Sequence, residues 1–182
     1  MNNFHKFNYD CNAEVLADEL LLNRHLWGVY PHRTNYPESA HQDITDIWIR
    51  YPEIDNATPI QVFNELECVN YQGFFELPSV RAEIFNVMQK VQGERLGRCI
   101  VTKLKPGGQI APHIDEGDPV GYYDRFHVCI QAHGANLFLC GKESVTMKPG
   151  ELWWFDNTQT HSVENHGNID RIHLVMDIRI AR

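Results

Sequence analysis

The stretch that decides the fold runs from residue 98 to residue 115 and reads RCIVTKLKPGGQIAPHID. Its first part, Arg98–Lys105, has the length and β-branched content of a strand, and Pro106-Gly107-Gly108 marks a tight turn after it. His113 and Asp115 follow the turn, two positions apart. Because residues i and i+2 of an extended segment point to the same side, this imidazole and this carboxylate can bind one metal ion together. The stretch therefore predicts a strand, a turn and the first two ligands of a metal site.

A His-x-Asp tripeptide is a short motif that also arises by chance. Ten His and eleven Asp in 182 residues give about 0.6 expected copies, and a second copy does occur at His41-Gln42-Asp43. Only the later copy has a third ligand at a suitable spacing, because His161 follows 48 residues after His113, behind the apolar run Gly150–Phe155. Two imidazoles and one carboxylate leave coordination positions open, as in non-haem Fe(II) oxygenases, whereas structural zinc sites are closed by four ligands. We predict that His113, Asp115 and His161 bind a metal, and we interpret His41 as a surface or substrate-side residue.

Strand-like segments continue from this stretch to the end of the sequence. They are short, separated by turn residues, and expected at 125–133, 136–141, 143–148, 151–155, 162–165 and 171–179. Many short strands at regular spacing are typical of a sandwich or jelly roll, in which distant ligands converge at one mouth. We expect a mainly β fold with flanking helices (α+β), a jelly roll with helices on one outer face.

The first half of the sequence contains helical patterns and one clear strand. Helices are expected from the cap Asn12 to about Arg24, and from the cap Ser79 to Gly93. The strand Ile44–Tyr51 alternates, which places three side chains on one face: Asp46, Trp48 and Arg50. Asp46 and Arg50 could bind substrate through opposite charges beside an aromatic wall, or the face could be a solvated sheet edge. We expect one domain over residues 1–182, with a support region at 1–97 and a metal-binding jelly-roll core at 98–182.

Composition narrows the classes of partner. A net charge of −8 argues against a nucleic-acid backbone as the main partner, and no apolar run reaches the length of a bilayer span. The first residues lack the basic-then-apolar pattern of a secretory signal. Five widely spaced cysteines without a Cys-x-x-Cys pair are expected to be reduced core residues. We therefore expect a cytoplasmic protein with a small-molecule or peptide substrate; the sequence does not predict an oligomeric state.

Two arginines lie near the predicted ligands. Arg125 and Arg171 each open a strand pattern, where most arginines are solvated or form an ion pair. A planar guanidinium is, however, the natural receptor for a carboxylate. A dicarboxylate cosubstrate that chelates iron would need such a receptor.

At these residues the sequence resembles the aspartyl/asparaginyl β-hydroxylase family of Fe(II)/2-oxoglutarate dioxygenases, which includes bacterial free-proline hydroxylases. The resemblance rests on the order of motifs over about residues 98–179: Lys105-Pro106-Gly107-Gly108, Pro112-His113, Arg125-Phe126-His127, Gly150 through Phe155-Asp156 to His161, and Arg171 through Asp177. It implies a double-stranded β-helix (jelly roll, cupin-like) with Fe(II) on His113 and His161. It also implies 2-oxoglutarate on Arg171, ten positions after the distal His, with help from Arg125, His127 and the hydroxyl of Thr102.

One departure from the family pattern concerns the carboxylate. Animal members have Gly where this sequence has Asp115, so the chain is more similar to the bacterial small-substrate branch. The function that the resemblance implies is hydroxylation of an amino-acid or peptidyl substrate with Fe(II), 2-oxoglutarate and O2, releasing succinate and CO2. The alternatives are a cupin-like metal enzyme of other chemistry and a non-catalytic jelly roll that binds a small molecule.

Overall fold

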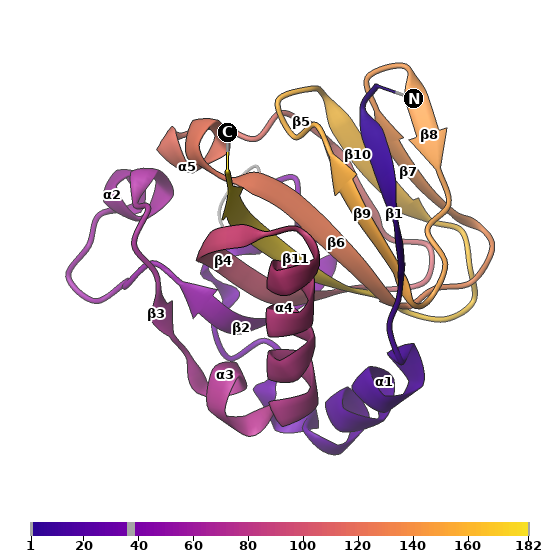
Figure 1. Ribbon diagram of the computed structural model, residues 1–182, viewed down its shortest axis with the longest axis horizontal. Coiled ribbons are helices and arrows are strands. Elements are labelled where there is room, and N and C mark those ends of the chain that lie inside the picture. The colour runs from indigo at the N-terminus through magenta and orange to yellow at the C-terminus, as the bar shows by residue number, and fades with distance from the viewer. Residues whose placement is uncertain (1, 36–38, 182) are drawn as a thin grey trace.

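The computed structural model describes residues 2–35 and 39–181, which form two antiparallel sheets with helices on one side (Figure 1). The order of the larger sheet is β1 (Phe4–Asp10), β9 (Glu151–Phe155), β6 (Asp124–Gln131), β11 (Arg171–Ile180), β4 (Gly93–Leu104), β2 (Ile44–Tyr51) and β3 (Val69–Asn70). The order of the smaller sheet is β5 (Gln109–His113), β10 (His161–Asn165), β7 (Asn136–Cys140) and β8 (Glu143–Val145). The two sheets form the expected jelly roll, the double-stranded β-helix.

Two apolar cores hold the layers together. One lies between the sheets and includes Phe4, Phe138, Trp153 and Phe155. The other lies between the outer face of the larger sheet and the helices α1 (Ala13–Leu22) and α4 (Pro78–Lys90). Figure 1 shows α1, α4 and the short α3 (Gln72–Glu76) on this outer face. The face toward the smaller sheet therefore remains available to line a site.

The strand pattern of the second half is confirmed, with shifts at the ends. Each expected segment corresponds to one of β4, β6, β7, β8, β9, β10 and β11. The sequence reading missed β1, β3, β5 and three short helices: α2 (Pro59–Asn64), α3 and α5 (Asp118–Tyr122). The first half is also more than a support, because β1 and β2 are strands of the same sheet as β4. Among the described residues, none of the helices combines the length and the apolar character that crossing a bilayer requires.

The two expected helices differ in how they are capped. The Asn12 side chain caps α1 as predicted, accepting a hydrogen bond from the Val15 amide at 3.3 Å. The prediction that Ser79 caps α4 is wrong: the helix begins at Pro78, and the Glu19 carboxylate of α1 accepts from the Ser79 and Val80 amides at 2.8 and 2.9 Å. A cap supplied by another element leaves no signal in the sequence next to the helix.

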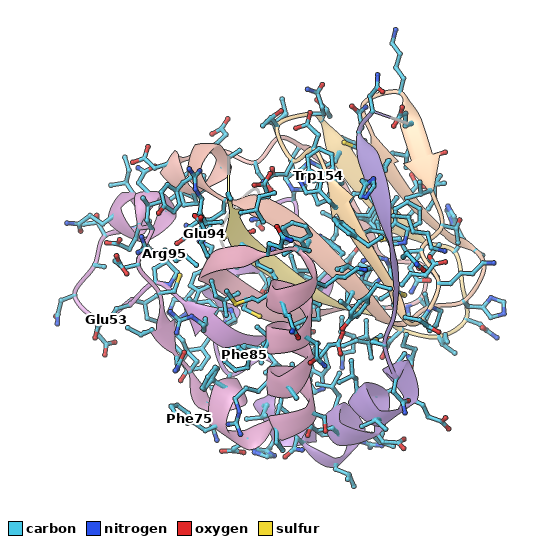
Figure 2. The ribbon with its side chains drawn as sticks, viewed as in Figure 1. Glu53, Phe75, Phe85, Glu94, Arg95 and Trp154 are labelled. Carbon is cyan, nitrogen blue, oxygen red and sulfur yellow. The ribbon has the colours of Figure 1, made fainter. Side chains whose placement is uncertain are left out.

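Side chains also cover the outside of the helical layer, where the exposed Phe75 and Phe85 are labelled in Figure 2.

Strand β2 departs from simple alternation. A β-bulge lies between Trp48 and Arg50, whose partners on β4 are Ile100 and Cys99. Because a bulge inserts one extra residue, the alternation shifts beyond it. The Trp48 and Tyr51 rings therefore stack with centroids 4.0 Å apart. The expectation that Asp46, Trp48 and Arg50 share one face is wrong at Arg50, whose place beside Trp48 is taken by Tyr51.

Candidate metal centre and its cavity

A cavity of about 1020 Å³ lies between the inner faces of the two sheets. Its wall combines residues from β2, β4, β6 and β11 of the larger sheet with residues from β5 and β10 of the smaller one. Helix α2 covers part of the rim, through Pro59, Ile60, Val62 and Phe63. Such a cavity, with a few convergent polar groups in a largely apolar wall, is the usual form of a small-molecule site.

The structure brings the three predicted metal ligands together in this cavity. His113 ends β5, His161 begins β10, and the two are paired across the smaller sheet. Asp115 lies just beyond β5, with its Oδ1 3.6 Å from His113 Nε2 and 3.9 Å from His161 Nε2. All three potential ligand atoms lie within 4.8 Å of one another. The donor set suits a divalent first-row metal that keeps open positions.

Backbone contacts fix which imidazole nitrogens face the metal position. The Nδ1 of His113 lies 2.8 Å from the Ala111 carbonyl, and the Nδ1 of His161 lies 3.0 Å from the Gln159 carbonyl. A carbonyl only accepts, so each Nδ1 carries the proton and each Nε2 lone pair points toward Asp115. Burial lowers the pKa of His161 to about 4, so this ring is neutral at pH 7. Neutral imidazole is the form that binds a metal.

The carboxylate of Asp115 is held on its other side by an arginine and an asparagine. Arg125 Nη1 donates to Oδ2, and the Asn157 side-chain amide donates to the same oxygen at 3.1 Å. Burial opposes ionisation of Asp115, but the charge of the Arg125 guanidinium holds the pKa of that carboxyl well below its usual range. The guanidinium of Arg125 also contacts Asp177, at 2.7 and 3.0 Å. Arg125 therefore lies in the cavity wall with its charge shared between two carboxylates.

Arg171 lies in the cavity wall without such a partner. It is 3% exposed, and its guanidinium lies over the Phe138 ring at 5.7 Å. Its Nη2 lies 3.3 Å from the Nδ1 of His173, and no carboxylate pairs with it in the part of the chain that the structure describes. Burial lowers the pKa of Arg171 to about 10, which leaves it charged at neutral pH. A buried, unpaired cation is costly to maintain, and an anionic ligand would relieve that cost.

The two remaining predicted cosubstrate residues also line the cavity. His127 is buried, and its Nδ1 lies 3.4 Å from the Nδ1 of His173. Burial, with a contribution from Arg171, keeps the pKa of His127 well below its ordinary value. The hydroxyl of Thr102 is buried and has no hydrogen-bond partner among the described residues. Both therefore offer polar atoms to a ligand in the same space as Arg171.

The residues suggested for substrate binding have partners within the protein. Asp46 accepts hydrogen bonds from Arg33 at 2.9 and 3.0 Å, and Arg33, not Asp46, lines the cavity. Arg50 donates to the Cys68 carbonyl at 2.6 Å and to Asn70, and it is not among the lining residues that the structure describes. His41 does line the cavity, with its ring 4.8 Å from that of His113.

Several cavity residues were missed by sequence reasoning. Asp177 could have been found, because strand alternation from Arg171 places it on the same face of β11. Asn157, which binds Asp115, lies in the loop before His161, and Arg33 lies in a short 3-10 helix. Loop and helix residues of this kind carry no periodic signal that would place them at a site.

Comparisons with known proteins agree with this arrangement. A family model described as aspartyl/asparaginyl β-hydroxylase matches residues 76–180, which is more than half of the chain. A comparison with curated protein sequences found no match.

Solved structures of several oxygenases share the fold. A prolyl-4-hydroxylase from Pseudomonas putida aligns with a TM-score of 0.57 at 12% identity, covering 100% of this chain and 95% of that one. A prolyl hydroxylase from Trichoplax adhaerens, in complex with a hypoxia inducible factor peptide fragment, has a TM-score of 0.56 at 13% identity, with 98% and 84% covered. An oxidoreductase of the 2OG-Fe(II) oxygenase family from Burkholderia pseudomallei has a TM-score of 0.53 at 16% identity, with 90% and 78% covered. At these identities the likeness shows the fold.

Proposed function

The chain belongs to the aspartyl/asparaginyl β-hydroxylase family, and from that premise we propose that it is an Fe(II)/2-oxoglutarate-dependent dioxygenase. It would hydroxylate an amino-acid or peptidyl substrate, using O2 and releasing succinate and CO2. The observation that carries the proposal is the presence, in one cavity, of a His-Asp-His triad and a buried guanidinium without an anionic partner. The triad would bind a metal ion, and the guanidinium would bind the carboxylate of a ligand.

The residues present fit Fe(II). His113, Asp115 and His161 would hold it, through two Nε2 atoms already directed at one carboxylate oxygen. Their arrangement leaves the cavity side free, as a facial set of two His and one carboxylate does. When bound, the iron and the 2-oxo acid supply the oxidising chemistry with O2.

The remaining residues bind and orient. Arg171 would hold the far carboxylate of 2-oxoglutarate through a charge-assisted, two-point contact. Thr102 and His127 would form hydrogen bonds with the cosubstrate beside Arg171, which would give the Thr102 hydroxyl the partner that it lacks. Arg125 orients the metal ligand Asp115 directly, through a hydrogen bond to its carboxylate. It would affect the cosubstrate only indirectly, as a neighbouring side chain. The apolar wall excludes water from the reacting groups.

An amino-acid or peptidyl substrate is consistent with the size of the cavity, which exceeds what a five-carbon dicarboxylate fills. The Trichoplax relative in fold was solved with a peptide fragment bound. These points support an amino-acid or peptidyl substrate.

Titration of 2-oxoglutarate into the anaerobic Fe(II)-loaded protein tests the proposal. A visible charge-transfer band is expected in the wild type, and Arg171→Met should lose it at the same ligand concentration. Arg24→Gln, at an exposed arginine outside the cavity, is the matched control. Metal binding without the band would instead favour a cupin-like enzyme of other chemistry, and absence of metal binding would favour a non-catalytic binding module.

A further inference from the structure

We propose that Arg98 binds an acidic group of the primary substrate, and that the substrate is therefore a carboxylic acid with an apolar or aromatic body. The inference rests on the proposed function and adds a substrate class to it.

Four of the described arginines line the cavity, and two of them are already neutralised. Arg33 pairs with Asp46, and Arg125 pairs with Asp115 and Asp177. Arg98 and Arg171 have no carboxylate partner among the described residues. In the proposed function 2-oxoglutarate accounts for Arg171. Arg98 is half-buried, and its hydrogen-bond partners are neutral carbonyls, so its charge is left for a second anion.

The two unpaired arginines lie too far apart to share one small ligand. Arg171 is paired across the sheet with Leu104, and Arg98 is six residues before Leu104 on β4. At about 3.4 Å per residue these positions are separated by roughly 20 Å along the strand. A five-carbon dicarboxylate is much shorter than that, so a ligand on Arg98 is a separate molecule.

Arg98 is nevertheless close to the metal centre. It lies on β4 where the register with β11 shifts, between Met176 and Ile178 of that strand, so it flanks Asp177. Asp177 is paired in turn with Arg125 on β6. Two strand spacings, or about 10 Å, therefore separate the backbones of Arg98 and Arg125. A substrate of moderate length with its acid on Arg98 reaches the space in front of the triad.

The guanidinium of Arg98 is fixed in place but incompletely used. Its Nη2 donates to the carbonyls of Val62 and Phe63 at 3.0 and 2.7 Å, at the end of α2. Its carbon lies 5.5 Å from the centroid of the Tyr51 ring. Its Nε is buried and has no hydrogen-bond partner in the described part of the chain. Its Nη1 also has no hydrogen-bond partner among the described residues and, unlike Nε, is not enclosed. A carboxylate in the cavity could accept from Nη1, in the charge-assisted contact that arginine favours.

The surfaces on either side of Arg98 are apolar. The stacked rings of Trp48 and Tyr51 form one wall, and Ile100 and Val175 lie between Arg98 and the cosubstrate end. The rim is unusually apolar for exposed residues: Ile60, Phe63 and Ile114 are 69%, 43% and 49% exposed. Exposed apolar side chains grouped around a cavity mouth mark a binding surface. They would contact the apolar body of the substrate.

The test measures binding of matched acid and amide pairs to the full chain loaded with Mn(II) and 2-oxoglutarate without O2. The probes are 3-phenylpropionate, octanoate and N-acetyl-phenylalanine, each compared with its primary amide by calorimetry. At least one acid should bind about tenfold or more tightly than its amide, as loss of a charge-assisted contact predicts. Arg98→Gln should remove this advantage while leaving amide binding, and Arg98→Lys should keep part of it.

Two controls separate this inference from the proposed function. Arg95→Gln, on the same strand and labelled in Figure 2, pairs with Glu67 outside the cavity and should retain the acid preference. The affinity for 2-oxoglutarate should be the same in wild type and Arg98→Gln. If no acid in the panel outcompetes its amide, or if Arg98→Gln retains the preference, the role of Arg98 is overturned while the proposed function stands. If 2-oxoglutarate itself does not bind, the proposed function fails.

Discussion

The Arg125 guanidinium donates a hydrogen bond to the carboxylate of Asp115, which is the third member of the His-Asp-His triad. The opposite edge of the same guanidinium contacts Asp177 at 2.7 and 3.0 Å. This chain of contacts ties the orientation of a metal ligand to residues of β6 and β11. We therefore propose that Arg125 is a positioning residue for the candidate metal ligand Asp115; the role in cosubstrate binding that the family resemblance implies stays a prediction.

Replacing Arg125 with Met should weaken metal binding by about 10- to 100-fold, because partners behind a ligand commonly contribute that much. Titration of Mn(II) by calorimetry measures the effect. Arg179→Met, on the adjacent strand, is the control, since its guanidinium donates to the Tyr122 carbonyl away from the triad. Equal Mn(II) affinity in Arg125→Met and wild type would remove the positioning role.

The two histidines should be essential for the metal and dispensable for the fold. The double variant His113→Ala/His161→Ala should bind no Fe(II), while its circular dichroism spectrum should match that of the wild type, because two apolar cores hold the sheets without an ion. Asp115→Gly is a finer test, since the family resemblance implies that members with Gly at this position hold iron through two His. Wild-type iron stoichiometry in the double variant would show that the metal lies elsewhere.

Sequence patterns predicted most of the second half because its strands are short, regular and bounded by turn residues. The same patterns could not place Tyr51, because the bulge in β2 changes which side chains face the cavity. Nor could they find the cap of α4, where Glu19 comes from a helix sixty residues away. Both features depend on packing between elements, which leaves no local spacing in the sequence.

The candidate site also combines features that the sequence could predict with features that depend on packing between elements. The grouping of His113, Asp115 and His161 as candidate ligands could be predicted, because the motif spacing and the family resemblance both indicated it. The partners of the two arginines could not be predicted. Only the structure separates Arg125, shared between two carboxylates, from Arg171, which has none among the described residues.

Glu19 should stabilise α4 from outside that helix. Its carboxylate accepts from the Ser79 and Val80 amides, and a negative charge there also complements the helix dipole. Glu19→Ala should lower the free energy of unfolding by about 1–2 kcal/mol. Urea denaturation compared with Glu14→Ala, an exposed residue of the same helix, measures this loss. Equal midpoints for the two variants would contradict the cap.

Glu83 should make stability depend on pH. Burial raises the pKa of Glu83, although a hydrogen bond from Tyr9 at 2.7 Å opposes the rise. The folded state therefore holds a proton that the unfolded state, with a pKa of about 4.3, releases first. This contribution is fully present below about pH 4 and is lost as pH rises through the folded pKa. Glu83→Gln should unfold at higher urea than wild type at pH 8, and the gap should shrink toward pH 4. A gap that is constant over this range would contradict the shifted pKa.

Arg171 should show opposite effects on ligand binding and on the stability of the free protein. Loss of a charge-assisted pair in a buried site costs about 2–4 kcal/mol, so Arg171→Met should raise the dissociation constant for 2-oxoglutarate by roughly 30-fold or more. Arg171→Lys should recover only part of this affinity, because an ammonium cannot reproduce the two-point contact. Without ligand, however, the Met variant should unfold at the same or a higher temperature than wild type, because it no longer buries an unpaired charge. Thermal unfolding with and without saturating 2-oxoglutarate separates the two effects: the ligand should raise the midpoint of the wild type by clearly more than that of Arg171→Met. An equal ligand-induced rise in both proteins would exclude Arg171 as the carboxylate receptor.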